Sequence, residues 1–180
     1  FIGHPHNSLP GVEMNSGSLG HGLPVCVGMA LAGKMDGAPY RVYTVMGDGE
    51  LAEGSVWEGA MAAGHYHLDN LCAVVDRNGL QISGTTEDVM SHEPLAERFA
   101  AFGWHVIECD GNDMNSLDAA FTEAKETRGQ PSVVITHTIK GRGSSVMENK
   151  APWHHKVPNA EEYAQIQADL TSRKEAIEHA

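Results

Sequence analysis

The chain has 180 residues, enough for one domain with a true hydrophobic core, and its composition is ordinary for a soluble globular protein apart from an excess of glycine. A formal net charge of −12 argues against a nucleic-acid-binding surface, because phosphate contacts need clustered lysine and arginine. The sequence has neither a run of about 18 apolar residues nor a signal peptide, so we predict no membrane span.

Helical and strand-like segments alternate along the chain. Residues 16–34 predict a glycine-rich turn and then a small-residue helix, with Pro24 tolerated only in its first turn. Four nearly continuous apolar runs predict strands covered on both faces: 41–46, 71–76, 104–109 and 132–138. Apolar residues at helical spacing predict helices over 57–64, 95–102 and 117–124, the last with Asn115 and Ser116 as N-caps.

The alternation predicts an α/β fold: a doubly wound, mostly parallel sheet with helices on both faces. Residues 140–158 are rich in Gly, Pro, Lys and His and predict a long functional loop. Residues 160–179 predict a solvated helix. We therefore expect one α/β domain over 1–158, which lacks its N-terminal part, and a helical arm over 159–180. The chain begins at Phe1 rather than Met, and we expect further sequence upstream.

Three cysteines, Cys26, Cys72 and Cys109, lie in apolar runs. Their number is odd and no CxxC pair occurs, so buried reduced thiols in a cytoplasmic protein are predicted.

Polar motifs follow the first two predicted strands. Gly47-Asp48-Gly49-Glu50 comes after the first, and Asp76-Arg77-Asn78-Gly79-Leu80 ends the second. Adjacent parallel strands joined by one helix bring their carboxyl ends together. Carboxylate, amide and carbonyl oxygens there suit Mg²⁺ or Ca²⁺ bridging a phosphate, which the two glycines and the next helix N-terminus could approach closely. Either motif alone is also an ordinary turn signature.

Together the motifs resemble the thiamine-diphosphate fingerprint, a GDG followed by Asn after the next strand. The resemblance implies three ligands for Mg²⁺, for which Ca²⁺ or Mn²⁺ could substitute: the side chains of Asp48 and Asn78 and the backbone carbonyl of Leu80. Many family members have a second Asn where this chain has Gly79.

The flanking segments resemble transketolases, and most closely the split bacterial form in which two short subunits replace one long chain. The matching segments run from about residue 1 to 158: Gly3-His4-Pro5, Leu9-Pro10-Gly11-Val12-Glu13, Ser16-Gly17-Ser18-Leu19-Gly20-His21-Gly22, Glu53-Gly54, Gly64-His65, Ala101-Phe102-Gly103-Trp104, Gly141-Arg142-Gly143 and Trp153-His154.

The transketolase resemblance implies roles for single residues. His4 would line the substrate channel, His154 would contact the diphosphate and relay protons, and Glu53 would couple two cofactor sites across a subunit interface. The residues implied in cofactor binding are Gly17 and Leu19 at the aminopyrimidine and thiazolium, Gly47, Gly49 (donating its N–H to the diphosphate), Glu50, Asn78 and His154. Each of these residues also has an ordinary alternative role. His4 and His154 could be loop or surface histidines, and Gly17 and Leu19 could form a turn that leads into a helix. Glu53 could be a glutamate favoured by the dipole at a helix N-terminus.

The implied activity is transfer of a two-carbon ketol unit from a ketose phosphate to an aldose phosphate. The implied partner is a C-terminal subunit carrying the pyrimidine-binding domain, without which this chain is expected to be inactive, in a heterotetramer. A deoxyxylulose-phosphate synthase-like enzyme and a non-catalytic cofactor-binding module remain alternatives. The roles of His21 and His155 stay open, and the His65–His67 pair lacks the further ligands that zinc requires.

Overall fold

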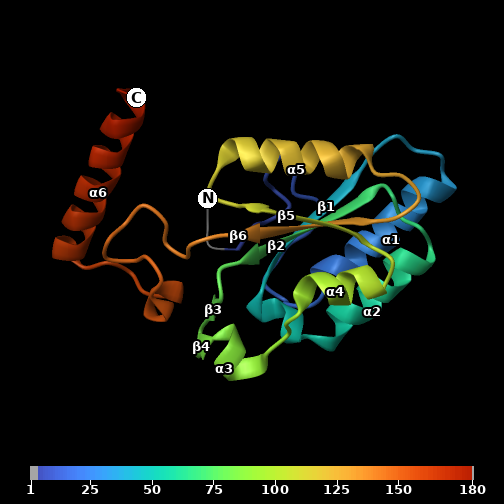
Figure 1. Cartoon of the computed structure of the whole chain (residues 1–180), viewed down its shortest axis with the longest axis horizontal. Helices are drawn as coiled ribbons and strands as arrows, with labels where there is room; N and C mark the ends of the chain where they lie inside the picture. The colour runs from blue at the N-terminus through green and yellow to red at the C-terminus, as the bar shows by residue number, and fades with distance from the viewer. Residues whose placement is uncertain (1–3, 180) are drawn as a thin grey trace.

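The computed structural model describes residues 4–179 and has a four-stranded parallel sheet with helices on both faces, which confirms the predicted fold class (Figure 1). The strands lie in the order β1-β2-β6-β5. Each matches a predicted strand to within a residue or two: β1 (Val42–Gly47), β2 (Leu71–Arg77), β5 (His105–Asp110) and β6 (Ser132–His137). Gly3 of the first transketolase-like segment lies outside the described residues.

The helices of residues 4–179 cover the two faces of the sheet, except for two that lie beyond the ends of the strands (Figure 1). The helices are α1 (Gly22–Met35), α2 (Gly54–His65), α3 (Thr86–Met90), α4 (Leu95–Ala101), α5 (Met114–Glu126) and α6 (Ala160–Glu178), with 3-10 turns η1 (Gly49–Ala52) and η2 (Ala151–His154). In Figure 1, α1, α2 and α4 lie below the sheet, α5 lies above it, and α3 and α6 lie beyond the ends of the strands. Each face has its own apolar cluster, the larger around Phe99 and Trp104 and the smaller around Ile107 and Val134.

Strand burial follows position in the sheet. The central strands β2 and β6 are buried over five consecutive residues each, which explains their unbroken apolar sequence. The edge strand β1 alternates instead, with Tyr43 and Val45 exposed on one face.

One local prediction is wrong. The N-cap of α5 is Asp113, whose side chain accepts from the Asn115 N–H, so Asn115 and Ser116 lie inside the helix. The helix expected after the Gly-Asp-Gly segment is α2, and the short turn η1 stands between Asp48 and its start at Gly54. A small antiparallel hairpin, β3 (Leu80–Gln81) with β4 (Gly84–Thr85), follows β2 and was not predicted.

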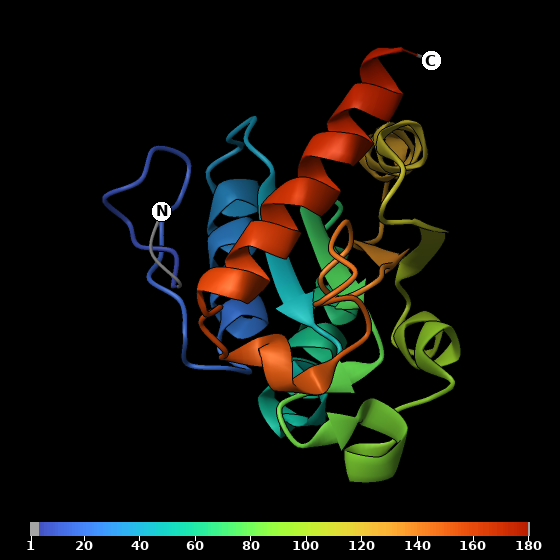
Figure 2. The same cartoon turned by 90° about the vertical axis from the view of Figure 1, so that its left-hand side faces the viewer.

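Figure 2 views the molecule from the end at which the strands finish, with the hairpin, η2 and α6 in front. The predicted solvated helix is confirmed as α6, which has no buried residue. The loop before it is fastened to α6 by Ser145, whose backbone N–H and hydroxyl both donate to Asp169. Within residues 4–179, none of the helices is both long and apolar enough to cross a bilayer.

Candidate functional site

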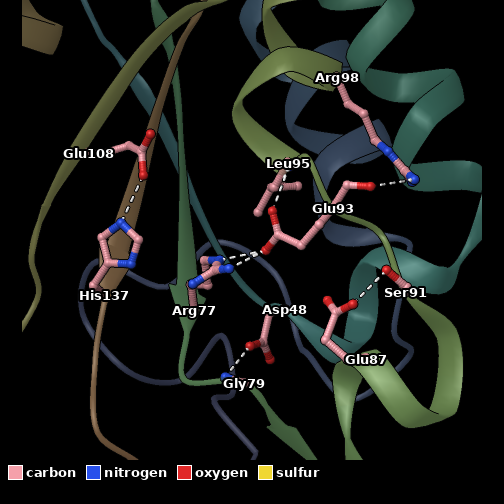
Figure 3. Close-up of polar contacts among 10 residues, drawn as sticks. All are labelled: Asp48, Arg77, Gly79, Glu87, Ser91, Glu93, Leu95, Arg98, Glu108 and His137. Carbon is pink, nitrogen blue, oxygen red and sulfur yellow. Dashed lines mark hydrogen bonds and ion pairs between the residues drawn. The ribbon is translucent and has the colours of Figure 1, made fainter.

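The two polar motifs meet at the tips of β1 and β2. Parallel pairing sets Gly47 opposite Asp76, and the Asp48 N–H donates to the Asp76 carbonyl at 3.2 Å. The Asp48 carboxylate, only 2% exposed, accepts from the Gly49 N–H at 2.8 Å and from the Gly79 N–H at 2.5 Å (Figure 3). Thus the carboxylate after the first strand is bonded directly to the loop that carries Asn78.

The predicted ligands keep lone pairs available for a cation. Each Asp48 oxygen accepts one backbone bond, and Asn78 Oδ1 accepts one from the Leu80 N–H at 3.0 Å, whereas such oxygens carry two lone pairs. In the hairpin, the Thr86 N–H donates to the Gly79 carbonyl. Hydrogen-bonded and non-bonded pairs alternate in an antiparallel ladder, so the next pair, Leu80 with Thr85, turns the Leu80 carbonyl away from β4. The donor set is therefore all oxygen, as Mg²⁺ requires.

Gly79 has a left-handed backbone, with φ of +75°. Glycine adopts this conformation without strain and asparagine is the residue that tolerates it next best. The departure from the family pattern at this position is therefore conformationally conservative.

Electrostatics at Asp48 favour binding of a cation. Burial raises the pKa of the Asp48 carboxyl and the neighbouring Asp76 raises it further, against the opposing effects of the Gly79 and Gly49 N–H groups and of His92. A desolvated carboxylate beside a second carboxylate gains from a divalent ion more than an exposed one does.

Two site residues had no signal in the sequence analysis. Gln81 packs on Gly49, where a Cβ would lie 2.9 Å from that of Gln81, and its buried Oε1 has no hydrogen-bond partner. His92 is 3% exposed, influences Asp48 electrostatically, and has an unpartnered Nδ1. An unsatisfied buried polar atom beside the Gly-Asp-Gly loop is what a missing polar ligand would leave.

The two glycines predicted to let a phosphate approach, of which Gly49 was predicted to donate its N–H, both have their N–H groups bonded within the protein. The Gly47 N–H donates to Glu50 Oε2 at 3.3 Å, and the Gly49 N–H donates to Asp48. Direct donation from Gly49 to a diphosphate would have to replace that bond. Glu50 likewise uses both carboxylate oxygens on backbone groups, the second accepting from the Gly20 N–H at 2.9 Å.

A second group of predicted residues lies on the exposed loop before α1. The ring of His4 lies against Gly17, where a Cβ would be 3.0 Å from the ring, and Leu19 is 56% exposed. This loop meets Glu53 through the buried Gly20, whose added Cβ would lie 2.6 Å from that of Glu53. Glu53 is the N-cap of α2 but its side chain makes no capping bond, so its carboxylate remains available for another role.

His154 lies at the end of η2, which lies against β3 and hence close to the strand-tip site. Partial burial lowers the pKa of His154, as do the charges of Lys140 and His155, and its ring meets the His155 ring edge-on at 4.7 Å between centroids. An imidazole so placed is neutral at neutral pH and can accept a proton.

Arg77, between Asp76 and Asn78, is paired with Glu93. Its guanidinium donates twice to Glu93 Oε1, and Glu93 Oε2 accepts from the Leu95 N–H at 2.9 Å (Figure 3). Burial raises the pKa of Glu93, but the Leu95 N–H and Arg77 outweigh it and hold that pKa below its usual value. This ion pair ties the β2 tip to the start of α4.

His65 ends α2 and His67 lies in the turn after it, and the His65 ring meets the Tyr66 ring edge-on. Across residues 4–179, no three His, Cys, Asp or Glu side chains gather in a way that could hold a metal.

Comparison with protein families gives a match over residues 1–177 to the family described as "Transketolase, thiamine diphosphate binding domain". Among curated proteins, an apulose-4-phosphate transketolase subunit of Phocaeicola vulgatus is 52% identical over 176 residues, covering 98% of this chain and 63% of that protein. The 6-deoxy-6-sulfo-D-fructose transketolase subunit SqwG of a Clostridium species is 46% identical, covering 81% and 53% respectively. The chain thus spans less than two thirds of these relatives.

Among solved structures, transketolase from Campylobacter jejuni superposes with a TM-score of 0.86 at 29% sequence identity. The match covers 94% of this chain and 28% of that one.

Proposed function

The chain belongs to the transketolase family of thiamine-diphosphate-binding domains, and we propose that it is the part of a split transketolase that grips the diphosphate of the cofactor through a divalent cation. In this proposal the complete enzyme transfers a two-carbon ketol unit from a ketose phosphate to an aldose phosphate. The relatives described above carry transketolase names, which favours this activity over a deoxyxylulose-phosphate synthase.

The convergence of Asp48, Asn78 and Leu80 at adjacent strand tips carries the proposal. These residues would hold Mg²⁺, with Ca²⁺ or Mn²⁺ as substitutes, and the ion would bind the diphosphate oxygens. Because the formal net charge is −12, and Asp48, Asp76 and Glu50 lie around the tip, a dianionic group needs a cation to bind there. The buried carboxylate and the unsatisfied Gln81 oxygen fit such a site.

The cofactor supplies the electron sink that lets a carbon–carbon bond beside a carbonyl break and re-form. The protein residues bind and orient: Gly17 and Leu19 would position the rings from the loop before α1, while Gly47, Gly49 and Glu50 shape the β1 tip. His154, neutral at neutral pH, would accept and return a proton of the substrate, with His4 lining the same channel. Glu53, with its carboxylate unused by capping, would reach across a subunit interface.

A partner is part of the proposal. Two relatives are named as transketolase subunits, which supports a second polypeptide. In the proposal this partner carries the pyrimidine-binding domain, and the two chains form a heterotetramer. All three cysteines are free, in line with the proposed cytoplasmic location, but the prediction that all are buried is wrong, because Cys26 and Cys109 are only half-buried.

Calorimetric titration of thiamine diphosphate with and without Mg²⁺ tests the binding role. We expect binding only with the divalent ion present. Adding the partner subunit should then give ketol transfer between a ketose phosphate and an aldose phosphate, whereas the chain alone should give none. Cofactor binding of equal strength in EDTA would refute the proposed metal-bridged site.

A further inference from the structure

Gly20 is buried although the residues before it in the loop, 15–19, are exposed. Its φ of +77° lies in the left-handed region, and a Cβ there would meet Glu53 at 2.6 Å and the Ser55 hydroxyl at 2.8 Å. The backbone at this point therefore presses directly against the segment that joins η1 to α2, and only glycine fits.

The backbone N–H and the carbonyl of Gly20 both form hydrogen bonds with side chains from that segment. Glu50 Oε1 accepts from the Gly20 N–H at 2.9 Å, and the Ser55 hydroxyl donates to the Gly20 carbonyl at 2.8 Å. The second oxygen of Glu50 accepts from the Gly47 N–H at the β1 tip. We call Gly20, Glu50 and Ser55 the Gly20 clasp.

The start of α1 has no side-chain cap. Its N-cap, His21, makes no side-chain capping bond, and no acidic residue lies in the first turn. The His21 ring bonds instead to the Leu19 carbonyl at 2.9 Å and to the Ser18 hydroxyl at 3.3 Å, both within the same loop. Since uncapped helix ends fray, the clasp supplies the bonds that tie this loop to the segment after β1.

We infer that Glu50 is a positioning residue that joins the two halves of the cofactor site: through one oxygen it holds the loop carrying Gly17 and Leu19, and through the other it holds the β1 tip carrying Asp48. Ser55 completes the grip on the loop. This inference rests on the proposed function, and it assigns Glu50 a role through the backbone rather than direct contact with the cofactor. Each of its oxygens already accepts a backbone N–H, and an ionised carboxylate has no donor to offer an anionic group.

Replacing Glu50 with Gln tests the clasp in the full chain. The amide can accept from only one of the two N–H groups and opposes the other with its own donors. Glu58, exposed on α2, gives the matched control, because Glu58→Gln removes the same charge away from the clasp. Ser55→Ala removes only the bond from the Ser55 hydroxyl to the Gly20 carbonyl, and Ser172→Ala on α6 is its control. This pair also tests the clasp if the Glu50 variant fails to fold.

Two readouts separate the possible outcomes. Amide hydrogen exchange without cofactor should accelerate in residues 17–25 of E50Q and S55A, but not in β2 or β6. The Kd for thiamine diphosphate at saturating Mg²⁺ should rise about tenfold or more for E50Q, as expected for one lost bond to a carboxylate, and stay unchanged in both controls.

Unchanged exchange in residues 17–25 would overturn the clasp. Faster exchange with an unaltered Kd would overturn its role in cofactor binding. Absence of binding by the unmodified chain would instead refute the proposed function, and this inference with it.

Discussion

Replacing Asp48 with Asn removes a carboxylate that is 2% exposed and bonded to the loop of the proposed second metal ligand. The shape is preserved, but the amide can accept from only one of the two N–H groups that the carboxylate binds, and it is a far weaker ligand for Mg²⁺. The substitution therefore separates the cost of a buried charge from its use in metal binding.

Without metal, the variant should be at least as stable as the original chain at pH 7. The pKa of Asp48 is raised in the folded state, chiefly by burial. A raised carboxyl pKa means that this group's contribution to stability is fully present below its unfolded pKa of about 3.9 and is lost as the pH rises through the folded pKa. Asparagine, which does not titrate, avoids that loss, and this gain opposes the cost of the lost charged hydrogen bond, which is about 1.5–3 kcal/mol.

With metal and cofactor the order should reverse. A ligand at a hundred times its Kd stabilises the folded state by about 2.7 kcal/mol, which for a chain of this size raises Tm by about 5–11 °C. Thermal melts of both proteins with and without Mg²⁺ and thiamine diphosphate measure this. We expect the full shift for the original chain and none for D48N. An equal shift in D48N would refute a metal held by Asp48.

Further outcomes follow from other contacts. Gly64→Ala should lower the free energy of unfolding by about 3 kcal/mol or more, because its Cβ would lie 1.8 Å from a backbone carbonyl oxygen. The control Gly28→Ala, in an open position of α1, should raise the free energy of unfolding by about 0.5–1 kcal/mol. Similar melting temperatures for the two variants would contradict this packing. Because the pKa of Glu93 is lowered, the contribution of Glu93 to stability is present above its unfolded pKa of about 4.3 and is lost as the pH falls through the folded value. Glu93→Gln should therefore flatten the acid limb of the profile of stability against pH. An unchanged limb would count against the ion pair with Arg77. Lys140→Gln should raise the pKa of His154, because the charge of Lys140 lowers it. With the partner subunit present, the acid limb of the pH profile of the transfer activity should therefore move to higher pH. An unchanged limb would show that His154 does not relay the proton.

The central strands β2 and β6 were predictable because they are buried on both faces and need unbroken apolar runs such as 71–76. The edge strand β1 was expected to be covered on both faces as well, but Tyr43 and Val45 are exposed. The meeting of Asp48 with the Asn78 loop followed from parallel pairing of consecutive strands. By contrast, the hairpin after β2 has only two residues on each strand, too few for any periodic pattern to mark it.

The finer structure of the site depends on contacts between segments far apart in sequence. The bond from Gly49 to Asp48 and the brace formed by Glu50 decide which N–H groups are free, and no local pattern shows this. Similarly, Gln81 and His92 enter the site only because the hairpin and the segment before α4 fold back over the β1 tip.

The proposed site depends above all on one divalent ion lying between the tips of β1 and β2. Anomalous scattering from crystals grown with thiamine diphosphate and Mn²⁺ tests this most directly. We predict a single manganese peak within bonding distance of the Asp48 carboxylate, Asn78 Oδ1 and the Leu80 carbonyl oxygen. A cofactor bound in ordered density with its manganese elsewhere, or with none between these atoms, would contradict it.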